Sequence, residues 1–151
     1  MRCLVDTNIL MDVFMHRTPF SDPAELMLAL GLVGELELWA SASQVTDAFY
    51  LLSEGGKRSL VGEARRVIKE ARKSVHICPV GEREIDAALD SPWEDFEDAC
   101  VHQCALKVNA DAIVTRNKKD YARSSINVFD CDELFDYLKR ERGLDYSFVD
   151  L

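Results

Sequence analysis

Short apolar runs alternate along this chain with longer stretches of helical periodicity. The runs typical of strands cover residues 3–5, 36–41, 75–80, 112–115 and 127–129. Between them, apolar residues recur at the three- and four-residue spacing of helices over residues 9–14, 21–33, 44–52, 57–74, 82–90, 95–109 and 131–140. Strands that alternate with helices predict an α/β fold, in which a central parallel sheet is covered by helices on both faces. We therefore expect one three-layer domain over residues 1–151.

Capping residues and glycines set the expected limits of several helices. Segment 21–23 predicts a helix start with Pro23 in the first helical position, and the helix ends near Gly34. Ser43 is the expected N-cap of the next helix, which closes at the glycine pair 55–56. The tail after residue 143 is assigned no element.

Composition narrows the class of protein. The chain has 151 residues, of which 48% are apolar, which suits one domain with a substantial core. The net charge of -9 argues against a broad basic surface for nucleic acid, although metal-binding carboxylates in a nuclease would account for part of it. No apolar run has the length of a membrane span, and the amino terminus is too short and acidic for a signal peptide. We expect a cytoplasmic protein with no membrane partner.

The five cysteines include no Cys-x-x-Cys pair, and most of their neighbours are apolar. They are expected to be small buried side chains in a reducing compartment. The three histidines are scattered, so their spacing gives no support to a zinc site.

Acidic residues stand beside the ends of the predicted strands. Asp6 follows the first strand, Asp47 lies in the helix after the second, and Asp120 lies in the loop after the fourth. Asp98 lies near the start of the helix that leads into the fourth strand. Because the carboxyl ends of parallel strands share one edge, these four carboxylates are expected to meet in one crevice. They would repel one another without a cation, and Mg²⁺ or Mn²⁺ prefers such oxygen ligands.

Each acid also has an ordinary interpretation. Asp95 is expected to cap its helix and Glu97 to be solvated, while Asp12 is a surface residue or supports the ligands from outside. Asp47 alone fits a helix acid favoured by the helix dipole. The case for Asp6 is the strongest, because a charge directly after an apolar strand costs free energy unless it is paired or coordinated.

Four segments resemble motifs of the PIN-domain family, and the resemblance covers essentially the whole chain. They are Leu-Val-Asp-Thr-Asn-Ile-Leu at 4–10, Ser-Ala-Ser-Gln-Val-Thr-Asp at 41–47, Asp-Phe-Glu-Asp-Ala at 95–99 and Thr-Arg-Asn-Lys-Lys-Asp-Tyr at 115–121. The last has the Thr-Arg-Asn form of VapC-like toxin ribonucleases. The resemblance implies a sheet of order 3-2-1-4-5 and a metal-dependent endoribonuclease, often the toxin of a toxin–antitoxin pair.

The resemblance also implies roles for residues at the expected crevice. The catalytic and metal-binding residues are Asp6, Asp47, Asp98 and Asp120, with Mg²⁺ or Mn²⁺ as cofactor. Supporting hydrogen-bonding residues are Thr7, Asn8, Thr115 and Asn117. Candidate contacts to RNA phosphates are Arg116, Lys118 and Lys119, which could equally form a solvated basic loop.

Two positions depart from the family pattern. Asn117 stands where many members have a fourth Asp, so the role of that fourth acid is weakened in this chain or passes to Asp120. Asp47 is one methylene shorter than the usual Glu and is expected to reach metal through water. These departures leave open one metal or two.

The expected function is hydrolysis of single-stranded or structured RNA. The implied partners are an RNA substrate, a cognate antitoxin and a second copy of the chain, with Phe14, Leu26 and Leu30 either at that interface or in the core. A non-catalytic or weakly active RNA- or protein-binding scaffold is the main alternative, followed by an RNA-processing nuclease that is not a toxin. A phosphatase-like enzyme ranks last, because Asn8 replaces the second acid of an Asp-x-Asp nucleophile motif.

Overall fold

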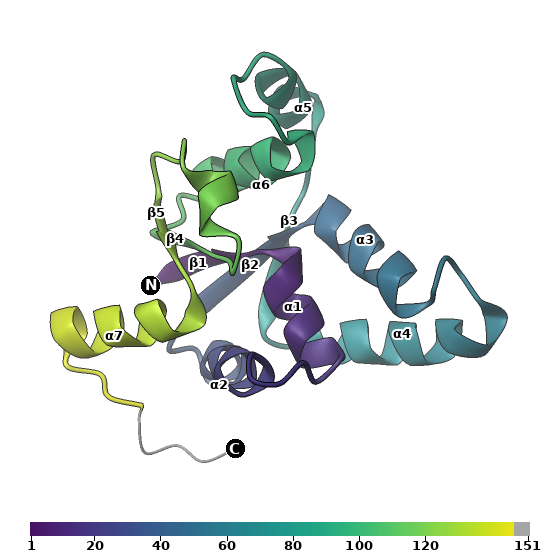
Figure 1. The fold of residues 1–151 in the computed structure, drawn as a ribbon, viewed down its shortest axis with the longest axis horizontal. Coiled ribbons are helices and arrows are strands. Elements are labelled where there is room, and N and C mark those ends of the chain that lie inside the picture. Colours follow the sequence, from purple (N-terminus) through teal and green to yellow (C-terminus); the bar gives the residue numbers. More distant parts are fainter. Residues whose placement is uncertain (147–151) are drawn as a thin grey trace.

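Five parallel strands form one sheet between two layers of helices in the computed structural model of this chain, which describes residues 1–146 (Figure 1). In chain order the elements are β1 (Arg2–Val5), α1 (Thr7–Phe14), α2 (Ser21–Leu32), β2 (Glu37–Ser41), α3 (Ala42–Leu52), α4 (Arg58–Ala71), β3 (Val75–Cys78), α5 (Glu82–Leu89), α6 (Phe96–Lys107), β4 (Ala112–Val114), the 3₁₀ helix η1 (Lys118–Tyr121), β5 (Asn127–Phe129) and α7 (Cys131–Arg142). The strand order is β3-β2-β1-β4-β5, which confirms the predicted fold class and the order 3-2-1-4-5. The last five residues of the predicted domain lie outside the described part of the chain.

The side-chain alternation of the central strand explains why both faces are covered. Cys3 and Val5 of β1 point into a core shared with α1, α2 and α7, whereas Leu4 points into a core built largely on α6. Figure 1 shows the same division, with α6 on one side of the sheet and α1, α2 and α7 on the other. All five cysteines are buried and unpaired, as predicted from their apolar neighbours.

Two predicted helix starts are wrong by two residues. Helix α2 begins at Ser21 after Phe20, so Pro23 is the third helical residue and not the first. The N-cap of α3 is Ser41 and not Ser43, because Ser41 Oγ accepts from the N–H of Gln44 (3.2 Å) and the Gln44 side chain accepts from the N–H of Ser41 (2.7 Å). This reciprocal pair starts the helix directly at the end of β2.

Strand register brings distant residues together at the carboxyl edge of the sheet. Val5 of β1 is paired with Val114 of β4, so the next residues, Asp6 and Thr115, are neighbours across the two strands. The N–H of Asp6 continues the pairing by donating to the carbonyl oxygen of Val114 at 2.9 Å. Helices α1 and α3 also begin at this edge, directly after β1 and β2. No helix within residues 1–146 is both long and apolar enough to cross a membrane.

Candidate active site

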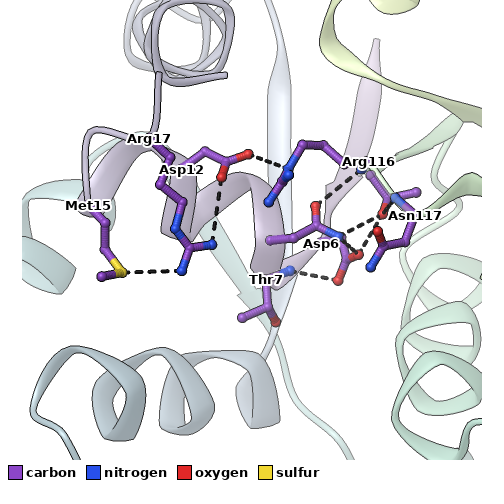
Figure 2. A network of polar contacts seen from close by, with 9 residues as sticks. Asp6, Thr7, Asp12, Met15, Arg17, Arg116 and Asn117 are labelled. Atoms are coloured by element: carbon purple, nitrogen blue, oxygen red, sulfur yellow. Dashed lines mark hydrogen bonds and ion pairs between the residues drawn. The ribbon is translucent and has the colours of Figure 1, made fainter. Parts of the chain in front are cut away.

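Asp6 is fixed at the end of β1 by three hydrogen bonds. Its Oδ1 accepts from the N–H of Thr7 at 2.7 Å, which also caps α1. Its Oδ2 accepts from Asn8 Nδ2 and from Thr115 Oγ1, both at 2.6 Å. Asp6 is 7% exposed, and its three donors lie in the segments that directly follow β1 and β4. The carboxyl group therefore has little freedom to move (Figure 2).

The Thr115–Asn117 loop is tied to the same carboxylate. Asn8 Nδ2 donates to Thr115 Oγ1 at 3.0 Å, and Asn8 Oδ1 accepts from the N–H of Arg116 at 3.2 Å. The N–H of Asn117 donates to Thr115 Oγ1 at 3.0 Å. Thr115 is fully buried, so its hydroxyl is a fixed relay between the end of β4 and Asp6.

Asp98 lies in the first turn of α6. Asp95 is the N-cap of this helix, and its Oδ1 accepts from the N–H of Asp98 at 3.1 Å, as the sequence predicts. Glu97 is exposed, as expected, but it also lines the cavity described next, so it is not only a solvated surface group.

One open cavity of about 620 Å³ collects the predicted acids, and we call it the acidic cleft. Its lining residues are Asp6, Thr7, Asn8, Met11, Arg17, Asp47, Tyr50, Leu51, Asp95, Glu97, Asp98, Asn117 and Asp120. Asp6, Asp47, Asp98 and Asp120 come from four separate parts of the chain, at β1, α3, α6 and η1. The structure thus brings the four predicted acids to one place, together with the supporting residues Thr7, Asn8 and Asn117, while Thr115 lies buried behind Asp6.

The carboxylates in the acidic cleft disfavour one another's charge. The pKa of Asp98 is raised to about 6, first by burial and then by the charges of Asp6, Asp95 and Asp120, while the hydroxyl of Tyr121 partly offsets the rise without reaching full hydrogen-bond geometry. Burial also raises the pKa of Asp6, against the hydrogen bonds from Thr115, Thr7 and Asn8. The pKa of Glu97 is also raised, first by partial loss of solvation at the wall of the cleft and then by the charges of Asp47 and Asp6. Negative charge here is not compensated by the nearby protein groups.

The donor set of the acidic cleft fits a hard divalent cation. All four predicted ligands offer carboxylate oxygens, and the Thr7 hydroxyl beside Asp6 is buried with no hydrogen-bond partner in the described chain. No three His, Cys, Asp or Glu side chains of residues 1–146 are already close enough to form a complete ligand cage. Carboxylate oxygens that line an open cavity suit Mg²⁺, which keeps several waters and needs only one or two carboxylates directly.

The three basic residues predicted to contact phosphate differ in their surroundings. Arg116 forms an ion pair with Asp12 (Nε to Oδ2, 2.7 Å) and lies over the Phe20 ring at 4.4 Å. Lys118 forms ion pairs with Glu133 at 2.5 Å and Asp130 at 3.4 Å. Lys119 has no such partner within residues 1–146 and is exposed. Of the three, Lys119 is the one whose charge is available to a ligand.

Asp12 is not a surface residue, because it is fully buried. Arg116 reaches one of its carboxylate oxygens, and Arg17 approaches the other at 3.8 Å from the opposite side (Figure 2). Burial raises the pKa of Asp12, and the two arginines lower it. Asp12 therefore supports the Thr115–Asn117 loop from behind through Arg116.

Several residues that line the acidic cleft were not predicted from the sequence, Arg17 and Tyr50 among them, and neither was the role of Gln44. Arg17 lines the acidic cleft from the α1–α2 connection, where the sequence indicates only a break between helices. Gln44 is fully buried, and its Nε2 donates to the carbonyl oxygen of Val5 at 3.0 Å, which joins α3 to the end of β1. The Ser-x-x-Gln spacing of a capping box at 41–44 was the signal available for Gln44.

Comparisons with known proteins agree on one family. A family model of the PIN domain matches residues 2–119. Ribonuclease VapC1 of Aquifex aeolicus (strain VF5) is 25% identical over 126 residues, which are 80% of this chain and 85% of that protein.

Solved structures share the fold. VapBC2 from Rickettsia felis, bound to a DNA fragment from its promoter, has a TM-score of 0.63 and 16% identity over 86% of this chain and 98% of that chain. PAE2754 from Pyrobaculum aerophilum has a TM-score of 0.62 and 18% identity over 93% of this chain and 90% of that chain. VapC20 of Mycobacterium tuberculosis is described as a sarcin–ricin loop cleaving toxin. It has a TM-score of 0.55 and 14% identity over 74% of this chain and 86% of that chain.

Proposed function

The chain belongs to the PIN-domain family, and we propose that it is a metal-dependent endoribonuclease acting as the toxin of a toxin–antitoxin pair. The observation that carries this proposal is the acidic cleft, in which Asp6, Asp47, Asp98 and Asp120 converge from four elements. The relative named Ribonuclease VapC1 supports the choice of RNA as substrate.

Asp6 and Asp98 are the proposed main ligands of Mg²⁺ or Mn²⁺. Asp47 completes or orients the ligand set, and Asp120 or Asn117 holds a water or a second ion. When bound, the metal supplies Lewis-acid chemistry, which lowers the pKa of water and neutralises charge that develops on the phosphate.

The chain's own groups position the reactants. Three hydrogen bonds hold the Asp6 carboxylate in place before any substrate arrives, which reduces the cost of ordering the site. Glu97 lines the same cavity, and we propose it as the group that accepts a proton from the attacking water. The N-terminal turn of α6 adds a favourable dipole for negative charge beside Asp98.

Metal removal tests the activity. The protein is stripped with a chelator and incubated with an RNA oligonucleotide, and then Mg²⁺ or Mn²⁺ is added back. We expect cleavage only after the metal is restored. Equal cleavage in the presence of chelator contradicts the proposed metal dependence.

A non-catalytic scaffold is the second candidate, and Asn117 and the short Asp47 favour it. The same assay distinguishes the two functions. RNA that is bound but left intact at every metal concentration supports the scaffold and contradicts the nuclease.

The proposed partners are an antitoxin and a second copy of the chain in the cytoplasm. Structural neighbours that include VapBC complexes support the antitoxin, and an acidic cleft would attract an inserted Arg or Lys. Leu30 is buried in the core, and Phe14 and Leu26 pack against it, so these three residues are explained without a dimer. Expression that arrests growth, relieved by a small gene from the adjacent reading frame, would support the toxin role, and unaffected growth would contradict it.

A further inference from the structure

A second cavity adjoins the acidic cleft. It measures about 530 Å³ and is lined by Trp93, Glu94, Asp95, Asp98, Lys119, Asp120, Ala122 and Arg123. Asp95, Asp98 and Asp120 line both cavities. The two hollows therefore adjoin at these three acids, two of which, Asp98 and Asp120, are proposed catalytic residues, and together they form a longer depression.

Basic residues line both hollows in addition to the shared acids. On one side Arg17 lines the acidic cleft, and on the other Lys119 and Arg123 line the second cavity. Lys119 and Arg123 are exposed and have no ion-pair partner among residues 1–146. These three cations are the groups of the depression that can neutralise a polyanion.

Arg17 is held at the rim without being neutralised. Its guanidinium lies 3.8 Å from Asp12, whose other oxygen is taken by Arg116 at 2.7 Å, and its Nη2 donates to Met15 Sδ at 3.3 Å (Figure 2). The Arg17 side chain remains 42% exposed. The pairing therefore orients Arg17 and leaves donors free for a phosphate oxygen.

An exposed aromatic ring lines the same hollow as Arg17. Tyr50 lines the acidic cleft and is 59% exposed, with its ring meeting Phe49 edge-on at 5.7 Å. Exposed aromatic residues next to cations are the usual parts of a binding surface for single strands, because every unpaired base can stack on a ring. A paired base in a duplex offers no free face for such stacking.

We propose that a single RNA strand lies across both hollows, with its scissile phosphate at the shared acids. One flanking phosphate contacts Arg17 and a base stacks on Tyr50, while a phosphate on the other side contacts Lys119 and Arg123. The inference rests on the proposed ribonuclease function and adds to it the substrate class and the residues that bind it. Cations on both sides explain how a strongly acidic centre accepts a polyanion.

Binding to chelator-treated protein tests the path without cleavage. The probe is a fluorescent single-stranded RNA of about 12 nucleotides, read by anisotropy over a range of salt concentrations. We expect Arg17→Ala, and separately the double variant Lys119→Ala/Arg123→Ala, to weaken binding about tenfold. The slope of log K against log salt concentration should become less steep by about 0.7 for each phosphate contact removed. Tyr50→Ala should weaken binding about tenfold with little change in the salt slope, and Tyr50→Phe should bind as the wild type does.

Two controls make the result specific. Arg65→Ala removes one exposed positive charge from α4, outside both hollows, and should leave binding and the salt slope unchanged. An RNA hairpin with a fully paired stem should bind more weakly than the single strand. The proposed path is overturned if the Arg17 variant and the Lys119/Arg123 variant bind RNA as tightly as Arg65→Ala does. It is also overturned if the hairpin binds more tightly than the single strand.

Failure of the path and failure of the ribonuclease function give different results. If the wild type cleaves RNA but the flanking variants keep its KM and affinity, the path is wrong and the function stands. If the flanking variants weaken binding but no metal restores cleavage, the path stands as a binding surface and the nuclease function fails. If both the path and the ribonuclease function are correct, the flanking variants raise KM and leave kcat nearly unchanged.

Discussion

Asp6 serves structure and chemistry with different oxygens of one side chain. Its Oδ1 caps α1 through the N–H of Thr7, while Oδ2 is held by Asn8 and Thr115 beside the acidic cleft. Because the raised pKa of this carboxylate comes first from burial, the site keeps an unfavourable charge in place with hydrogen bonds. Such a placement is expected where a metal ion compensates the charge during function.

The ion pair of Arg116 with Asp12 gives a prediction at the residue scale. Arg116→Met leaves a fully buried carboxylate with only Arg17 nearby, at 3.8 Å. We expect the free energy of unfolding to fall by about 2–3 kcal/mol, less than for a fully enclosed pair because Arg116 is 30% exposed. Urea denaturation at neutral pH measures this loss.

The loss should depend on pH in a defined direction. Without Arg116, the folded-state pKa of Asp12, already raised, lies still further above its unfolded value. The folded state then holds a proton that the unfolded state has released, so stability falls as pH rises. The deficit of Arg116→Met relative to the wild type should therefore grow as the pH rises above the ordinary pKa range of an aspartate. A deficit that shrinks as the pH rises contradicts the role given to Arg116.

At the scale of elements, the acidic cleft is built from helices that begin near the carboxyl edge of the sheet. Asp6 and Asp98 lie at the starts of α1 and α6, Asp47 lies in the middle of α3, and α1 and α3 begin directly at strand ends. The Ser41–Gln44 capping box fixes the start of α3, and Gln44 also binds the carbonyl oxygen of Val5. One buried side chain thus links the helix that carries Asp47 to the strand that carries Asp6.

Substitutions at this junction should separate the true cap from the predicted one. Ser41→Ala should cost about 1 kcal/mol of stability, as other N-cap losses do. Gln44→Ala should cost about 2–3 kcal/mol, because it leaves the Val5 carbonyl and the Ser41 N–H buried without these partners. Ser43→Ala, at the position predicted from the sequence, is the matched control and should cost less than Ser41→Ala in thermal unfolding. A larger loss at Ser43 would contradict the observed cap.

The sequence predicts strands better than helix starts for a physical reason. Strands such as Ala112–Val114 stand out because apolar runs are needed to fill both faces of a buried sheet. The start of α3 depends on which of two nearby serines meets Gln44, and Ser41 and Ser43 both have the composition of a cap. Placement at a strand end likewise predicts Asp6, and placement at the start of the helix before the fourth strand predicts Asp98, whereas Arg17 enters the cleft only through the path of a connecting loop.

For the whole molecule, the acidic cleft concentrates part of a net charge of -9. A parallel sheet makes this possible, since it carries residues about a hundred positions apart, such as Asp6 and Thr115, to adjacent strand ends. The sequence predicts that convergence from topology, but not the ion pairs that occupy Arg116 and Lys118, because those depend on which acids α1 and α7 place beside them.

Divalent metal should stabilise the folded chain measurably. A ligand that binds only the folded state at about ten times its Kd adds about 1.4 kcal/mol, which raises Tm by roughly 3–6 °C for a chain of this size. We expect this rise with MgCl₂ against NaCl of equal ionic strength, in differential scanning fluorimetry. Asp98→Asn should abolish the rise in Tm. The control variant Asp86→Asn, which changes an exposed residue of α5, should keep it. An equal rise in wild type and Asp98→Asn would place the ion elsewhere.

The central claim is that the acidic cleft is the active site of a ribonuclease, and single-turnover cleavage tests it most directly. Wild type, Asp6→Asn, Asp98→Asn and the surface control Asp86→Asn are compared on one single-stranded RNA with saturating Mg²⁺. Loss of a ligand or its charge should slow cleavage by at least about a hundredfold for Asp6→Asn and Asp98→Asn, while Asp86→Asn cleaves as the wild type does. Cleavage by both cleft variants at the wild-type rate would contradict the account.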